Sequence, residues 1–243
     1  MRGRLSAPER AALDAIVAAA GSAYAPAGRT PLHFARGKLR HDPVFRAIVA
    51  RGLIPDGTRL VDLGCGQGVL PAFLFAARGC YERGEWPTAW PPPPRLASVL
   101  GVDLRRRAIA AARVALRERA TVRVGNVRDA EIPQCEVITI LDVLHYLPPD
   151  DQAGVLARCA AALAAGGTLL LRVGDADAGV RAAVTRLSDQ AITLLRGGWP
   201  RLYTRGLKAW VAAVEQASFH VEAAPMSAGT PFANVLLVAR RSG

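Results

Sequence analysis

Short apolar runs alternate with longer amphipathic stretches over most of the chain. The runs are rich in Val, Ile and Leu at consecutive positions, which is typical of strands buried on both faces of a parallel sheet. The stretches between them have helical spacing, so the pattern predicts an α/β fold with helices on both faces of the sheet. We expect strands over residues 60–63, 98–103, 121–127, 136–143, 168–173, 220–226 and 234–240. We expect the intervening helices over residues 69–77, 104–119, 150–165, 180–195 and 207–217.

The last two expected strands are separated only by a turn, Ser227–Pro231. A connection this short cannot hold a helical crossover, so the last strand should run antiparallel to its neighbour.

The N-terminal part reads as a separate helical segment. Ser6 and Glu9 have the spacing of a capping box that opens a helix to about Ala20. Asp42–Pro43 starts another helix, Val44–Arg51. The stretch between them, Tyr24–Arg40, is rich in polar and aromatic residues and is expected to be irregular. We therefore divide the chain into an N-terminal helical lid or substrate segment, residues 1–54, and a ligand-binding domain, residues 55–243.

A Trp/Pro-rich loop interrupts the α/β pattern over residues 82–97. Four consecutive prolines, Pro91–Pro94, exclude a helix or a central strand, so we expect an exposed loop. Trp86 and Trp90 either pack back on the domain or contact a substrate, a partner protein or a membrane surface.

The most informative stretch is Asp62–Gly68, where an apolar strand breaks into Gly64, Gly66 and Gly68 before a helix begins. Glycine permits close approach of the backbone, so we expect N–H groups of this turn to face a ligand. The spacing G-x-G-x-G differs from the G-x-G-x-x-G of dinucleotide-binding enzymes, which disfavours a nicotinamide-dependent oxidoreductase. The leading acid would repel a phosphate and attract an ammonium group, so the ligand should lack a pyrophosphate.

A second acid, Asp103, ends the next strand. A carboxylate there can accept hydrogen bonds from both hydroxyls of a ribose. The alternative is that Asp103 caps the helix that follows it.

Net charge and cysteine content restrict the possible functions less than the glycine turn and Asp103 do. The net charge is +11, from 31 Lys and Arg against 20 Asp and Glu. It indicates either a nucleic acid or anionic membrane partner, or simply an arginine-rich proteome, and the even spread of arginines favours the latter. The four cysteines form no CxxC, so we expect no metal site, reduced thiols and a cytoplasmic protein. No apolar run is long enough for a transmembrane helix and no signal peptide is expected.

Five motifs between about residues 55 and 173 resemble, in order, those of class I S-adenosylmethionine-dependent methyltransferases. They are VDLGCGQG, LGVDLRRRAIAAAR, VRVGNVRD, ITILDVLHYLP and LAAGGTLLLRV. The resemblance implies a Rossmann-like seven-stranded sheet, mostly parallel with an antiparallel last strand, and S-adenosylmethionine as cofactor. Residues 55–243 would then be the methyltransferase domain.

The resemblance also assigns roles to cofactor-binding residues. Asp103 would hold the ribose and Leu104 would lie against the adenine, while Asn126 stands where the family usually has an acid. Arg36 and Lys38 are candidates for the cofactor's carboxylate or for an acidic substrate. The remaining candidates are Asp62, Gly64, Cys65 and Gly66 at the turn, Val127 at the adenine, and Leu141 and Asp142 near the sulfonium.

In such enzymes the methyl group moves by in-line displacement, and a base is needed only if the acceptor's proton has a high pKa. His145, three residues beyond Asp142, is the first candidate base, and His33 is the second. The alternative for His145 is a structural contact with Tyr146. The acceptor pocket should form from the lid and from residues 180–206, a substrate-side insertion. Candidate substrate contacts are Tyr24, Phe34, His145, Tyr146, Trp199 and Tyr203.

We therefore expect transfer to an oxygen or carbon of a hydrophobic or aromatic small molecule or a carrier-bound acyl intermediate. The lid is also similar to methyltransferases of bacterial aryl-polyene and polyketide pigment pathways, which would imply secondary metabolism and a phenolic acceptor. An RNA methyltransferase using the arginine surface is one alternative. Nucleic acid is disfavoured because DNA adenine methyltransferases carry an Asn/Asp-Pro-Pro-aromatic motif where this chain has Asp142–His145. A non-catalytic module that binds partners through the Trp/Pro-rich loop is the other alternative, and the oligomeric state stays open.

Overall fold

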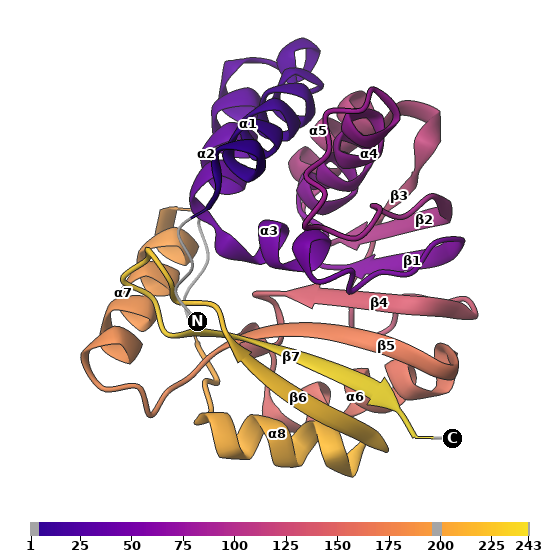
Figure 1. The fold of residues 1–243 in the computed structure, drawn as a ribbon. Coiled ribbons are helices and arrows are strands. Elements are labelled where there is room, and N and C mark those ends of the chain that lie inside the picture. The colour runs from indigo at the N-terminus through magenta and orange to yellow at the C-terminus, as the bar shows by residue number, and fades with distance from the viewer. Residues whose placement is uncertain (1–4, 196–200, 243) are drawn as a thin grey trace. The chain divides into compact units, whose positions relative to one another are not determined.

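The computed structural model describes residues 5–195 and 201–242, without the side chains of 188, 189 and 191–195. In this part of the chain the strands form one seven-stranded sheet of order β3-β2-β1-β4-β5-β7-β6 (Figure 1). The chain divides into two compact units, residues 1–126 and 127–243. The division falls within the region expected to be one domain, and residues 5–54 belong to the first unit.

The first unit holds the N-terminal helices and three strands. Its strands all run parallel, with Leu63 of β1 opposite Val102 of β2 and Asp103 of β2 opposite Val124 of β3. Helix α1 packs on both α2 and α4. The elements are α1 (Ala7–Ser22), η1 (Ala25–Ala27), α2 (Arg29–His41), α3 (Pro43–Ala50), β1 (Thr58–Leu63), α4 (Val69–Glu82), β2 (Leu96–Asp103), α5 (Arg106–Leu116), η2 (Arg117–Arg119) and β3 (Thr121–Val124).

The second unit begins with β4 and ends with the reversed strand. Strand β4 runs parallel to β5, and β7 runs antiparallel to both β5 and β6, so the predicted antiparallel last strand is confirmed. The elements are β4 (Cys135–Leu141), η3 (Leu144–Tyr146), α6 (Pro149–Ala162), β5 (Leu163–Gly174), α7 (Val180–Leu195), α8 (Leu207–Gln216), β6 (Phe219–Pro225) and β7 (Asn234–Arg241). None of the helices in the described ranges is long and apolar enough to cross a membrane.

The expectation of irregular structure over Tyr24–Arg40 is wrong, because most of that stretch is α2. Pro31 lies in the first turn of this helix, where its missing N–H costs nothing. Ala35 and Leu39, four residues apart, are buried on one side of it. The helix therefore depends on this narrow apolar stripe, which the many surrounding polar residues obscure in the sequence.

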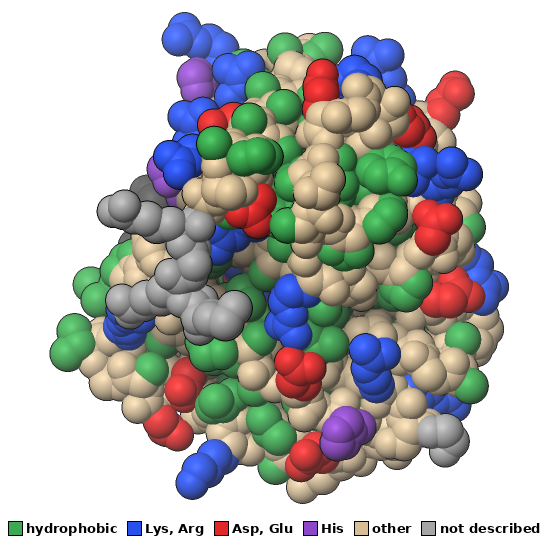
Figure 2. Space-filling model, in the orientation of Figure 1, with side chains coloured by type: hydrophobic (Ala, Val, Ile, Leu, Met, Phe, Trp, Pro, Cys, Tyr) green, Lys and Arg blue, Asp and Glu red, His purple; other side chains and the backbone are tan. Residues whose placement is uncertain are grey.

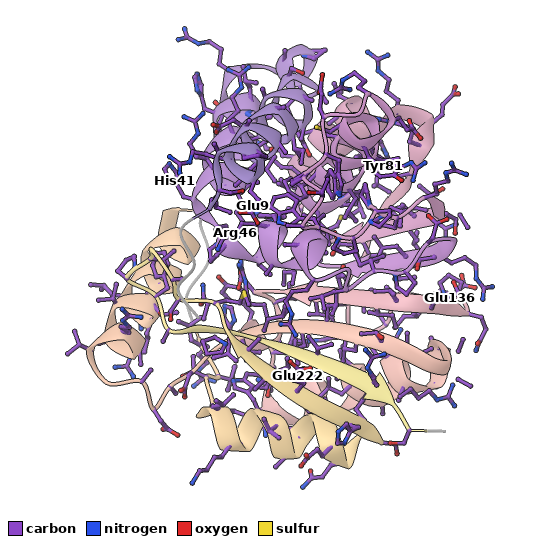
Figure 3. The ribbon with its side chains drawn as sticks, in the orientation of Figure 1. Glu9, His41, Arg46, Tyr81, Glu136 and Glu222 are labelled. Carbon is purple, nitrogen blue, oxygen red and sulfur yellow. The ribbon has the colours of Figure 1, made fainter. Side chains whose placement is uncertain are left out.

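Trp90 of the Trp/Pro-rich loop packs back on the first unit, which is the first of the two alternatives given for it. Its side chain is buried, and its indole N–H donates a 2.9 Å hydrogen bond to Glu9 of α1, which Figure 3 labels. Trp86 is half-buried and lies edge-on to Trp90, with ring centroids 5.4 Å apart. The loop joins α1 to the sheet and leaves Trp90 unavailable to a membrane or partner.

The start of α4 depends on a glycine in a left-handed conformation. Gly68 is the N-cap of α4 with φ 70°, where a side chain is strained. A Cβ on Gly68 would also lie 2.6 Å from Leu116 Cδ1 and 3.3 Å from Ala112 Cβ of α5. The third glycine of the turn thus allows α4 and α5 to pack closely.

We predict that Gly68→Ala lowers the free energy of unfolding by about 2–4 kcal/mol, because backbone strain and overpacking add. Gly154→Ala is the matched control. Gly154 lies inside α6 with nothing within 4 Å of its added Cβ, so this change should stabilise the protein by about 0.5–1 kcal/mol. Denaturant unfolding of both variants measures the difference. Equal stability of the two variants would contradict the role given to Gly68.

Candidate functional site

The turn after β1 is fixed by hydrogen bonds to β2. Gly64, Gly66 and Gly68 all have positive φ, 78°, 59° and 70°. The N–H groups of Gly64 and Cys65 donate to the Val102 carbonyl at 2.7 and 3.0 Å, and that of Gly68 donates to Cys65 O. The expectation that the turn's N–H groups face a ligand is therefore wrong for Gly64, Cys65 and Gly68, whose N–H groups are bonded within the protein. For the other N–H groups of the turn and the start of α4 it stays a prediction.

Asp103 is the polar centre of this region. Its buried carboxylate accepts hydrogen bonds from the backbone N–H of Gly66 at 2.8 Å and of Arg105 at 2.9 Å. The Arg105 guanidinium also contacts both oxygens, at 3.0 and 3.2 Å. The bond to Arg105 N is a local turn, but the N-cap of α5 is Arg105 and no side chain caps this helix, so the alternative that Asp103 caps it is wrong. The bond to Gly66 N ties β2 to the glycine turn. Leu104, next to this acid, is 67% exposed.

Arg105 is a residue that the sequence patterns did not single out. Its side chain is 43% exposed and covers the turn, since a Cβ on Gly66 would lie 3.2 Å from its Nη2. A ligand that uses the Asp103 oxygens must therefore displace the guanidinium.

Tyr24 supports the turn from the N-terminal segment. Its side chain is fully buried, and its hydroxyl donates a 2.8 Å hydrogen bond to the Gln67 carbonyl. Burial is the main cause that raises the pKa of Tyr24 above its ordinary value, with Cys65 and Asp62 adding to it. Burial likewise raises the pKa of the Cys65 thiol, which stays protonated and unreactive. The contact between Tyr24 and a substrate stays a prediction.

The second unit holds a buried ion pair at the end of β4. Asp142 follows β4 with a positive φ of 62°. Its carboxylate accepts from Nε of Arg172 at 2.7 Å and from Nη2 of the same guanidinium. Arg172 lies on β5 and is 1% exposed, whereas the Asp142 side chain is 30% exposed. The pairing is bidentate, which fixes the orientation of the carboxylate at the strand end.

His145 lies in η3, directly after this pair, and is 4% exposed. Its ring packs on Tyr146 with centroids 4.2 Å apart at 47°. Burial is the main cause that lowers the pKa of His145. The negative charge of Asp142 raises this pKa and the positive charge of Arg172 lowers it further. The imidazole is therefore neutral near pH 7 and able to accept a proton. The contact with Tyr146 is the one expected for a structural histidine, so packing and base chemistry are both compatible with this position.

A hydrogen-bond network around Gln152 holds η3 in place. The Gln152 amide nitrogen, buried in α6, lies within hydrogen-bond distance of three carbonyls, Leu144 O at 3.1 Å, Leu147 O at 2.9 Å and Tyr203 O at 3.1 Å, which share its two N–H donors. Arg205 Nε donates to the Gln152 amide oxygen at 2.7 Å, and Tyr203 N donates to His145 O at 2.7 Å. The backbone of Tyr203 thus lies beside His145, as the prediction of a shared pocket requires. Gln152 and Arg205 were missed because nothing in the helical pattern distinguishes them.

The other predicted residues are spread over both units. Lys38 forms a 3.1 Å ion pair with Asp42, and Phe34 is 41% exposed on α2. Asn126 and Val127 follow β3 at the boundary of the units, Leu141 ends β4, and Trp199 lies outside the described residues. Among the described residues no group of three or more His, Cys, Asp or Glu could hold a metal ion.

Residues 61–169 match a family model described as a methyltransferase domain. A carboxy-S-adenosyl-L-methionine synthase from Chromohalobacter salexigens is 30% identical over 129 residues, which cover 51% of this chain and 43% of that protein. A ubiquinone biosynthesis O-methyltransferase from Alkalilimnicola ehrlichii is 29% identical over 121 residues, covering 47% of this chain and 41% of that protein. The matched region thus spans less than half the length of either relative.

The fold is also similar to that of a methyltransferase of known structure. An O-methyltransferase family protein from Burkholderia thailandensis superposes with a TM-score of 0.64 at 17% identity, over 86% of this chain and 57% of that chain. Together with the strand order, these similarities relate residues 61–169 to methyltransferase domains and support S-adenosylmethionine as the cofactor.

Proposed function

We propose that this chain transfers a methyl group from S-adenosylmethionine to an oxygen of a hydrophobic or aromatic small molecule. The observation that carries the proposal is the glycine turn tied to the buried Asp103 carboxylate. The choice of oxygen is supported by the similarity to a ubiquinone biosynthesis O-methyltransferase. Transfer to carbon, or to a carrier-bound acyl intermediate, is the variant that the same site also permits.

The residues of the first unit fit the cofactor. Asp103 offers two buried carboxylate oxygens to the ribose hydroxyls, and the exposed Leu104 beside it offers an apolar surface to the adenine. Asp62, buried at the end of β1, carries the negative charge that suits the cofactor's ammonium group. The bound cofactor supplies a sulfonium that makes its methyl group electrophilic, so the protein's task is to align the acceptor and exclude water.

We propose His145 as the base that accepts the proton of a hydroxyl acceptor. Its lowered pKa keeps the imidazole neutral, and its buried position lets it act in a water-poor site. The bidentate Asp142–Arg172 pair supports the η3 turn from which His145 projects. His33 is the weaker candidate, because its side chain is exposed on α2 among other basic residues.

The two alternatives have less support. An RNA methyltransferase would need exposed arginines beside Asp142, whereas Arg172, which pairs with Asp142, is buried. On the face in Figure 2, acidic and apolar side chains separate most of the Lys and Arg side chains. A non-catalytic module acting through the Trp/Pro-rich loop would leave the Asp103 site without a use. Cytoplasmic localisation stays a prediction, and the four cysteines, which are buried and form no disulfide in the described part of the chain, are compatible with it.

We predict that Asp103→Ala weakens S-adenosylmethionine binding by about 1–3 kcal/mol, because charge-assisted hydrogen bonds to the ribose are lost. Isothermal titration calorimetry measures the affinity, and circular dichroism checks the fold. Unchanged affinity in a folded variant would refute the ribose assignment. Failure of the wild-type protein to bind the cofactor would favour the non-catalytic alternative.

Arg105→Ala should act in the opposite direction. Removing the guanidinium frees the Asp103 oxygens, so the cofactor should bind more tightly by about 0.2–1 kcal/mol, the value of an exposed ion pair. The same calorimetric titration tests this change. Weaker binding in this variant would show that Arg105 contacts the cofactor rather than competing with it.

We predict that His145→Ala lowers turnover by about 10²–10⁴-fold and leaves cofactor affinity nearly unchanged. Methyl transfer from labelled cofactor to a panel of phenols, hydroquinones and short RNAs provides the assay. Wild-type turnover should rise with pH through the lowered pKa of His145, below about 6.5, and then level off, since only the neutral imidazole accepts a proton. The variant should lack this limb of the profile.

His220→Ala is the matched control, because His220 is exposed on β6. It should keep its turnover within about twofold, as surface substitutions usually do. A fully active His145→Ala variant would remove His145 as the base. Methylation of RNA alone within the panel would replace the small-molecule acceptor by the nucleic-acid alternative.

A further inference from the structure

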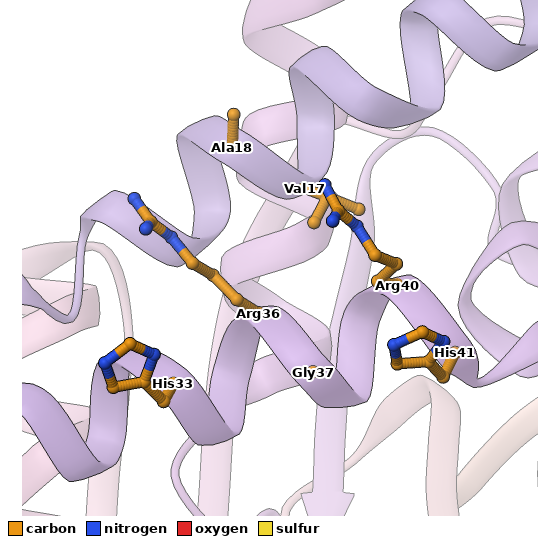
Figure 4. A pocket seen from close by; sticks show the side chains of 7 residues that line it. All are labelled: Val17, Ala18, His33, Arg36, Gly37, Arg40 and His41. Carbon is orange, nitrogen blue, oxygen red and sulfur yellow. The ribbon is translucent and has the colours of Figure 1, made fainter.

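A cavity of about 350 Å³ lies between α1 and α2 in the first unit. Its lining comes from Val17 and Ala18 of α1 and from one side of α2 (Figure 4). The α2 residues are His33, Arg36, Gly37, Arg40 and His41. Four basic side chains therefore surround a small apolar floor, and none of the described lining residues is acidic.

The four basic side chains have no polar partner among the residues that the structure describes. In the described ranges none of His33, Arg36, Arg40 and His41 forms a hydrogen bond or ion pair with another residue, whereas the nearby Lys38 is paired with Asp42. Figure 4 shows the side chains of Arg36 and Arg40 extending from α2 toward α1, with both histidines on the flank of α2. Figure 2 shows Lys, Arg and His side chains close together over this part of the molecule.

Two glycines shape the cavity. The stem of Arg36 crosses Gly21 of α1, where a Cβ would lie 2.5 Å from Arg36 Cγ. Gly37 lies between the two arginines along α2, and a Cβ there would meet nothing within 4 Å. The helix therefore leaves open space where most residues would fill it. An interior glycine costs a helix about 1 kcal/mol relative to alanine, so this space is retained against helix propensity.

We propose that this cavity binds the phosphate group of a small phosphorylated molecule, with Arg36 and Arg40 as its main contacts. Arginine forks bind phosphate oxygens in bidentate fashion, and a concave site lined by one sign of charge concentrates the field on an anion. Two arginines, two imidazoles and no carboxylate suit a group with two or more negative charges better than a single carboxylate. The cavity shares no lining residue with the proposed cofactor site around Asp103, and the proposal does not depend on the methyltransferase assignment.

The size of the site favours a small molecule over a nucleic acid. The basic lining of α2 extends from residue 33 to residue 41, about 12 Å at 1.5 Å per residue. This length matches one phosphate ester or diphosphate, and the volume lies at the small end of ligand pockets. A nucleic acid would instead need a longer basic stripe that follows its backbone.

The test is calorimetric titration of the full chain with inorganic pyrophosphate at 0.15 M ionic strength. At this ionic strength charges are screened over about 8 Å, so distant basic residues contribute little to binding. We expect saturable one-to-one binding to the wild-type protein. Arg40→Gln should weaken it by about tenfold or more, since a charge-assisted contact is lost. Gly37→Leu should abolish it by filling the cavity, and because its Cβ enters open space the helix should stay folded.

Arg107→Gln is the matched control for charge, because Arg107 is exposed on α5 and outside the cavity; it should change the affinity by less than about twofold. S-adenosylmethionine binding and the thermal unfolding temperature of each variant show whether it is folded. These two measurements do not involve pyrophosphate, so a failure of the methyltransferase assignment is distinguished from a failure of this proposal. No pyrophosphate binding to the wild type, or equal binding by all variants, would overturn it. Tight binding of a single-stranded RNA oligonucleotide, with an affinity that falls with salt as steeply as contacts to several phosphates require, would overturn the proposal in favour of a nucleic-acid surface.

Discussion

The hydrogen bond between the Gly66 N–H and the Asp103 carboxylate connects the two elements that form the proposed cofactor site. It joins the turn after β1 to the end of β2 at 2.8 Å, while Val102 O of the same strand accepts from Gly64 and Cys65. A turn held this way needs little reorganisation when a ligand arrives, which lowers the entropic cost of binding. It also explains the short glycine spacing. The turn bends back onto its neighbouring strand instead of opening its N–H groups toward a phosphate.

The sequence predicted most of the sheet but less of the site. Strands were recognisable because apolar residues buried on both faces leave a continuous signal, and Asp103 was recognisable because an acid ended such a strand. The role of Arg105 was not, because a local ion pair has no pattern that separates it from the neighbouring Arg106 and Arg107. The helix α2 was missed for a related reason, since only Ala35 and Leu39 of its residues are buried. The packing of Trp90 on Glu9 depends on residues 81 positions apart, which periodicity cannot report.

In the second unit, a buried arginine determines the surroundings of the proposed base. Arg172 is 1% exposed near the end of the apolar strand β5, and a charge in such a place is tolerated only when it is paired. Its pairing with Asp142 holds that residue at a positive φ, which is unusual outside glycine and strained. The strain lies directly before η3, and the Gln152 network fixes η3 from its other side. Two independent constraints therefore hold His145, as expected for a residue that must meet a substrate in one orientation.

The basic side chains behind the net charge of +11 have different roles in different parts of the molecule. Arg172 and Lys38 are paired with acids, and Arg158 donates to the carbonyls of Val127, Arg128 and Ala130, so these cations stabilise the fold. On α2, four basic side chains instead face a cavity without partners among the described residues. Cations that repel one another on a single helix lower its stability, since like charges three or four residues apart are unfavourable. A helix that keeps both this repulsion and an interior glycine has the composition of a binding site, and an anion in the cavity would relieve the repulsion.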